Sequence, residues 1–105
     1  MERLVIVAYR PFPGKEKELL KLMKTHVEIL RKEGLASNRN SIIMQSKDNT
    51  IIEVFGWKSS EAIESAHTNL AVQKMWESYA KVCESIPISN VAEAGQLFSE
   101  FTPIN

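Results

Sequence analysis

Two segments of this chain alternate as β-strands do, yet each places apolar residues on both faces. In residues 3–10, the two faces carry Leu4, Ile6 and Ala8, and Val5, Val7 and Tyr9, respectively. In residues 51–58, one face carries Ile51, Phe55 and Trp57, and the other face carries Ile52 and Val54. An antiparallel sheet with one solvated face normally alternates apolar and polar residues. Both faces of this sheet are therefore expected to be covered.

The order of predicted elements is strand, helix, strand, strand, helix, strand, which is the ferredoxin-like split βαβ plan. Strands are expected at residues 3–10, 41–46, 51–58 and 90–101, and a first helix at residues 15–33. Gly34 is expected in the left-handed conformation that ends this helix. The second helical region begins after a Ser59 or Ser60 cap and ends before Pro87. We predict an α+β fold with a four-stranded antiparallel sheet and one domain spanning residues 1–105.

Two helical regions can cover only one face of such a sheet. The other apolar face needs a second cover, and a second copy of the same chain presents a surface of matching character. Buried apolar surface contributes about 25 cal/mol per Å2, so pairing two such faces would stabilise a dimer before association costs. The pattern predicts a homodimer that forms through the open face of the sheet.

The net charge of the chain limits the kinds of partner that it can bind. Thirteen basic and thirteen acidic residues give a net charge of zero. Nucleic acids and anionic membranes are bound through an excess of Lys and Arg, so neither is expected as a partner. Cys83 is the only cysteine, which excludes an internal disulfide framework and suits a reducing compartment. No apolar run is long enough to span a bilayer, and no cleavable signal is apparent. The prediction is a cytoplasmic protein.

His67 occupies an apolar helical stripe after the third strand. It shares a face with Ile63, Ala66 and Leu70, and the stripe continues beyond a break at residues 68–69 with Val72, Met75, Trp76, Tyr79 and Cys83. One interpretation is a core histidine satisfied by a hydrogen bond. The other is an acid/base group in a pocket. We expect His67 to point into a cavity bounded by Trp57, Trp76 or Tyr79.

Glu53 is a carboxylate within an otherwise apolar strand. In one interpretation it pairs with a basic residue on a neighbouring strand, such as Arg10. In the other it holds a base in place or itself takes a proton from a bound ligand. Strand parity leaves open which face carries Glu53 and whether it meets His67. His26 borders the apolar face of the first helix and is expected to be partly exposed.

The sequence lacks the motifs that are typical of metal-binding and nucleotide-binding sites. No Cys/His cluster has zinc spacing, and no carboxylate array reads as a metal site. Glycine-rich phosphate loops and nucleotide fingerprints are also missing. Neither a metal nor another cofactor is therefore expected.

The third strand and the region after it resemble the antibiotic biosynthesis monooxygenase family. The resemblance is carried by Glu53-Val54-Phe55, Trp57, the segment SSEAI at 59–63, Ala66-His67 and Trp76. It implies a dimeric α/β barrel, in which two ferredoxin-like sheets face each other. Members include oxygenases of quinols and aromatic polyketides that use neither metal nor flavin, and haem-degrading relatives. The asparagine of the haem-degrading pattern is missing from the first strand, and no histidine follows His67. The asparagine near the third strand of polyketide oxygenases is also missing.

The expected function is cofactor-independent monooxygenation of a small aromatic or quinol-like compound. His67 would be the base, Glu53 would position a base or take a proton, and Tyr79 would donate to the developing anion. Walls are expected from Phe55, Trp57, Trp76 and Met75. A non-catalytic, ligand-binding or stress-associated dimer stays open, as does an isomerase or lyase on the same scaffold.

Overall fold

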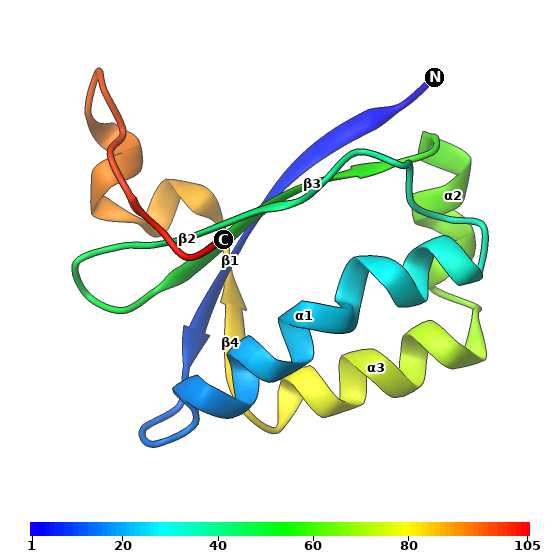
Figure 1. Cartoon of the computed structure of the whole chain (residues 1–105), viewed down its shortest axis with the longest axis horizontal. Coiled ribbons are helices and arrows are strands. Elements are labelled where there is room, and N and C mark those ends of the chain that lie inside the picture. The colour runs from blue at the N-terminus through cyan, green and yellow to red at the C-terminus, as the bar shows by residue number, and fades with distance from the viewer.

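An antiparallel sheet with the strand order β4-β1-β3-β2-β5 organises the computed structural model, which describes residues 1–105. Helices α1 and α3 lie side by side against the sheet (Figure 1). The helices and strands are β1 Arg3–Pro11, α1 Glu16–Lys32, β2 Ile42–Gln45, β3 Ile51–Trp57, α2 Ser60–Ala66, α3 Leu70–Ala80, β4 Cys83–Ile86 and β5 Thr102–Pro103. Two short 3₁₀ helices, η1 Ile88–Asn90 and η2 Ala92–Gly95, precede β5.

The predicted α+β class and antiparallel sheet are confirmed. The first helix and the first three strands lie where they were predicted, and β2 and β3 form the expected hairpin. Asn49 in the hairpin turn has φ of +71°, and Gly34 after α1 has φ of +74°. Ser59 caps α2, because its hydroxyl accepts a bond from the Ala62 amide at 3.1 Å.

The prediction of a strand at residues 90–101 is wrong. The fourth strand is β4, which lies before Pro87 in a stretch expected to be helical, and β5 adds a fifth strand beside β2. After Pro87 the chain turns in 3₁₀ bonds: the Asn90 amide donates to the Pro87 carbonyl, and the Val91 amide to the Ile88 carbonyl. Cys83 is therefore not on a helical stripe but on a strand, although it is buried.

One face of the sheet packs against the helices. Val7 pairs with Glu53 and Val5 with Phe55 across β1 and β3, and these side chains point toward α1 and α3. The helix α1 completes this core with Leu19, Met23, His26, Val27 and Leu30, spaced so that they share one side. The largest apolar cluster of the molecule therefore lies between the sheet and the helices.

The opposite face of the sheet is apolar as well, as predicted, and it is only partly covered. Ala8 and Ile52 pack there against Val91, from the segment that follows β4 and lies on the side of the sheet away from α1 and α3 (Figure 1). Beyond this segment, Leu4, Ile6 and Ile42 are 56%, 53% and 53% exposed. The chain itself thus covers one end of this face.

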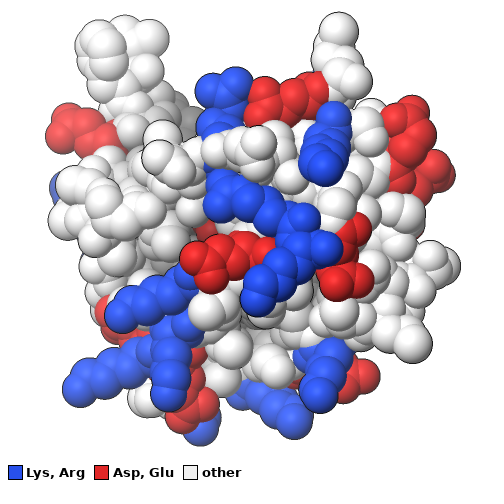
Figure 2. Space-filling view, turned by 45° about the vertical axis from the view of Figure 1, so that its right-hand side comes forward, with Lys and Arg blue, Asp and Glu red and all other residues white.

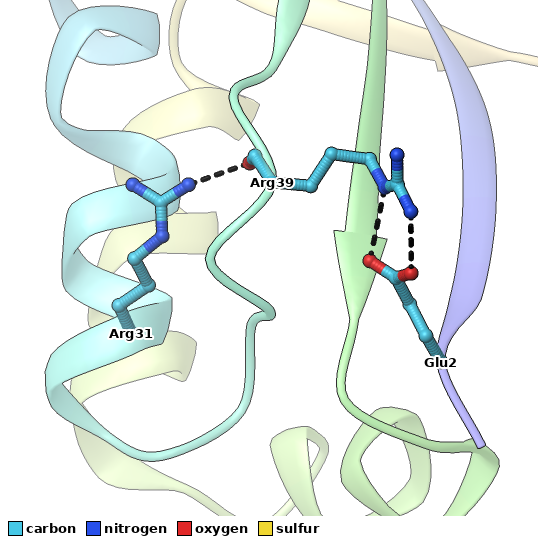
Figure 3. Close-up of polar contacts among 3 residues, drawn as sticks. All are labelled: Glu2, Arg31 and Arg39. Atoms are coloured by element: carbon cyan, nitrogen blue, oxygen red, sulfur yellow. Dashed lines mark hydrogen bonds and ion pairs between the residues drawn. The ribbon is translucent and has the colours of Figure 1, made fainter.

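Two arginine side chains form hydrogen bonds that connect the loop between α1 and β2 to α1 and to the start of β1 (Figure 3). The Arg31 guanidinium donates to the backbone carbonyls of Ser37 and Arg39, and Arg39 makes a two-pronged pair with Glu2 at 3.1 and 2.9 Å. Gly56 lies beneath, where a Cβ would contact Ser37 and Glu2. These contacts hold the start of β1, the end of β3 and the loop together.

Charges of both signs are mixed over the surface. On the face drawn in Figure 2, Lys and Arg side chains lie beside Asp and Glu side chains, as expected from thirteen residues of each sign. None of the helices combines the length and the apolar character that crossing a bilayer requires.

Candidate functional site

A cavity of about 420 Å3 lies between the sheet and the helices. Ten of its twelve lining residues are hydrophobic. The sheet contributes Tyr9, Phe55 and Trp57, and the helices contribute His26, Trp76 and Tyr79. A concave, largely aromatic space with few polar groups is the usual form of a small-molecule site.

His26 and Glu53 form a buried pair at the wall of this cavity. His26 Nδ1 lies 2.8 Å from Glu53 Oε1, and the two residues are 3% and 0% exposed. A carboxylate removed from water in this way needs a hydrogen-bonding partner. When Nδ1 donates to the carboxylate, Nε2 is the unprotonated nitrogen, and Nε2 makes no hydrogen bond within the chain. The pair therefore presents a proton acceptor oriented by a carboxylate.

Aromatic rings fix the orientation of the imidazole. The His26 ring meets Phe55 edge-on at 5.0 Å between ring centroids, and Tyr79 at 5.4 Å. Tyr79 in turn stacks on Tyr9 at 5.2 Å. Such contacts limit the rotation of the imidazole and hold its polar edge in place.

Two phenols at the cavity stay protonated at neutral pH. Burial, assisted by the nearby Glu53 carboxylate, raises the pKa of Tyr9 well above its ordinary value. Burial, assisted by Tyr9 and then Glu53, raises the pKa of Tyr79 in the same direction. The Tyr79 hydroxyl and Glu53 Oε2 are buried and have no hydrogen-bonding partner in the chain. Tyr79 therefore carries a hydrogen-bond donor at the cavity that no other group of the chain uses.

The expected position of His67 is wrong. His67 is exposed, its Nδ1 lies 3.0 Å from the Ile63 carbonyl, and it does not line the cavity. Its one aromatic contact is with Trp76, at 5.4 Å between centroids. Each residue turns a helix by about 100°, so the position after buried Ala66 swings outward. His67 ends α2 at that point.

Glu53 pairs with His26 rather than with Arg10 or His67. It lies on the helix-covered face, which answers the question that strand parity left open. His26 was expected to be partly exposed, and that prediction is wrong. The signal that locates His26 is its spacing from Met23 and Leu30, the three- and four-residue steps that define the buried side of α1.

The predicted wall residues divide into two groups. Phe55, Trp57 and Trp76 line the cavity, as the sequence suggested, and so does Tyr79, which was predicted as a hydrogen-bond donor. Met75 does not: it is 7% exposed and lies beside Leu22, Ile29 and other residues between α1 and α3. One step along a helix separates Met75 from Trp76, and that step turns Met75 toward α1.

Groups for holding a metal ion are not assembled. No three or more His, Cys, Asp or Glu side chains converge in the structure. The chemical groups of the cavity are thus the His26–Glu53 pair, the phenols of Tyr9 and Tyr79, and the aromatic walls.

The fold defined above, an α+β sheet with helices on one face, occurs in a solved structure of an oxygenase. That structure is SnoaB, a cofactor-independent oxygenase from Streptomyces nogalater, to which this chain is similar with a TM-score of 0.67 and 10% sequence identity. The similarity covers 81% of this chain and 86% of that one. At this identity the likeness shows the fold alone. No family model matches the chain, and no curated protein sequence matches it.

Proposed function

We propose that this chain is a cofactor-independent monooxygenase of a small aromatic, quinol-like compound, related to the antibiotic biosynthesis monooxygenases. The observation that carries the proposal is the buried His26–Glu53 pair at the wall of an aromatic cavity. The likeness in fold to SnoaB, itself a cofactor-independent oxygenase, supports it. His26 takes the role of base that the sequence suggested for His67.

The first step is removal of a phenolic proton. His26 Nε2 accepts this proton from the bound compound, while Glu53 holds Nδ1–H and stabilises the imidazolium that results. Imidazole is the side chain that most often serves as a general base in enzymes. Tyr79 donates a hydrogen bond to the oxyanion, and the apolar walls exclude water from it.

The second step is the reaction of the phenolate with dioxygen. The phenolate passes one electron to O2, and the resulting radical and superoxide combine in a new carbon–oxygen bond. The imidazolium returns its proton to the peroxide, which then loses water. For 1,4-dihydroxynaphthalene the balance is substrate plus O2 to 2-hydroxy-1,4-naphthoquinone plus H2O. The substrate supplies all the electrons, so no external reductant is consumed.

Oxygen uptake by the purified protein tests this function. We expect uptake with hydroquinones or anthrones in the presence of a chelator, and a product that carries one atom from 18O2. His26→Ala should lower turnover by about 100-fold or more, the usual contribution of a positioned base. His67→Ala, which removes an exposed histidine outside the cavity, should leave turnover close to wild type. Binding of these compounds without uptake would instead favour the non-catalytic ligand-binding alternative.

We propose further that the protein is a homodimer formed through the open face of its sheet. Three exposed apolar side chains lie together on that face: Leu4, Ile6 and Ile42. Leu97 and Phe98, in the segment that covers the other end of the face, are 94% and 79% exposed. Apolar surface of this kind marks an interaction site. A second copy would bury these side chains, and the sheets of the two copies would face each other to form a barrel.

A further inference from the structure

The wall of the cavity carries no permanent positive charge. None of its twelve lining residues is a lysine or an arginine. Its titratable lining residues are His26, Tyr9, Tyr79 and Cys83, and the Glu53 carboxylate lies directly behind His26. The phenols and the thiol are acids that burial holds in their neutral forms. The charge of the site is therefore set by the His26–Glu53 pair.

The His26–Glu53 pair carries one defined net charge in the protonation state in which His26 can act as a base. For Nε2 to accept a proton, the imidazole and carboxylate together hold a single proton, on Nδ1, and carry one negative charge. Transfer of a proton from a neutral phenol makes the pair neutral and the ligand negative. The total charge of the buried site is the same before and after the step, so no additional charge has to be buried.

A ligand that already carries an anionic group breaks this balance. A carboxylate would bring a second negative charge next to Glu53, in an apolar space without a cation to pair with it. Burying an unpaired charge is costly, and like charges close together in a low dielectric repel strongly. The unpaired Glu53 Oε2, which is fully buried, strengthens this repulsion.

We infer that the cavity selects uncharged phenols and excludes those that bear a carboxylate, sulfate or phosphate. The inference takes the proposed role of the cavity as its starting point and adds the substrate class. Its physiological compound is accordingly a neutral hydroquinone or phenol, whose only ionisation is the one that His26 brings about.

Three naphthols, two of them nearly identical in shape, test the inference by calorimetric titration at neutral pH. They are 2-naphthol, 6-hydroxy-2-naphthamide and 6-hydroxy-2-naphthoate, of which only the last is charged. We expect the amide to bind the wild-type protein at least tenfold more tightly than the naphthoate, equivalent to about 1.4 kcal/mol. Equal or tighter binding of the naphthoate would overturn the inference, and so would failure of all three to bind.

A variant pair at the opening of the cavity isolates the effect of charge. Ser85 lines the cavity and is exposed, so a longer side chain is accommodated there. Ser85→Lys should narrow or reverse the preference for the amide, whereas Ser85→Gln, similar in size, should keep it. An unchanged ratio in Ser85→Lys would count against the inference.

The same titrations separate this inference from the proposed function. Selection against the naphthoate in a protein that takes up no oxygen would keep the inference and remove the oxygenase. Oxygen uptake in a protein that binds the amide and the naphthoate equally would keep the oxygenase function and overturn the inference.

Discussion

Glu53 is the group whose burial places the greatest demand on this molecule. Its carboxylate is 0% exposed, lies in the middle of β3, and has His26 as its one hydrogen-bonding partner. A buried ion pair adds little to stability over an apolar replacement, but removal of one partner leaves a costly unpaired charge. Stability alone therefore does not explain the pair, and the proposed role of His26 as a base supplies a reason for it.

This asymmetry predicts the effect of separating the pair. His26→Ala should lower the free energy of unfolding by about 3–5 kcal/mol, because Glu53 then has no partner. The double variant His26→Leu/Glu53→Leu should recover most of this loss. His67→Ala, at an exposed site, should change stability by less than about 1 kcal/mol. Urea unfolding of the three variants measures these values, and equal losses for the two histidine→alanine variants would show that His26 and Glu53 are not energetically coupled.

Cys83 provides a second prediction for a single residue. Burial raises the pKa of its thiol from 9.0 to about 11, which reduces the thiolate fraction near pH 8 by roughly 100-fold. Alkylation by iodoacetamide should accordingly be at least 100-fold slower in the native protein than in urea. The thiol is favoured in its neutral form, so its contribution to stability is present below pH 9 and is lost as pH rises through 11. Rapid native labelling at pH 8 would contradict this environment.

The elements differ in how far the sequence predicts them. Helix α1 runs for 17 residues, so its apolar side is defined by several turns, and its position was predicted correctly. Helix α2 has 7 residues and β4 has 4, too few for a period to define a face or to separate strand from helix. The errors at His67 and in residues 90–101 both arise beside such short elements.

The site was less predictable than the fold for a related reason. Three of the four predicted wall residues line the cavity, since large aromatic side chains on a buried stripe have few other places to lie. The pairing of His26 with Glu53 joins α1 to β3 across 27 positions of the sequence. Periodicity places each residue on a buried side of its own element, but the contact between elements depends on how helix and sheet pack.

The ion pair at the start of β1 gives a prediction for the acid range. The two hydrogen bonds from the Arg39 guanidinium lower the pKa of Glu2 from 4.5 to about 2. A lowered pKa stabilises the fold above pH 4.5, and this contribution is lost as pH falls toward 2. Wild type should therefore be more stable than Glu2→Gln at pH 6, and the two should converge near pH 2. Urea midpoints across this range test it; a difference independent of pH would show that charge is not its cause.

In the whole molecule, the two faces of the sheet have different surroundings. The face toward α1 and α3 encloses the cavity, and the opposite face carries Ile6 and its apolar neighbours. The segment after β4 covers only one end of that opposite face, around Ala8 and Ile52. The cavity lies within one chain, so its chemistry and the proposed dimerisation are separable by substitution.

The proposed dimer predicts the effect of a charge on the open face. In a two-fold symmetric interface each substitution occurs twice, so Ile6→Lys would bring two like charges into an apolar contact. We expect the wild type to sediment at twice its 11.9 kDa chain mass and Ile6→Lys to sediment as a monomer at micromolar concentration. Leu70→Lys is the matched control, because Leu70 is 81% exposed at the start of α3, on the helix layer. It should remain dimeric. A wild type that sediments as a folded monomer would refute the dimer, and loss of the dimer in both variants would place its interface elsewhere.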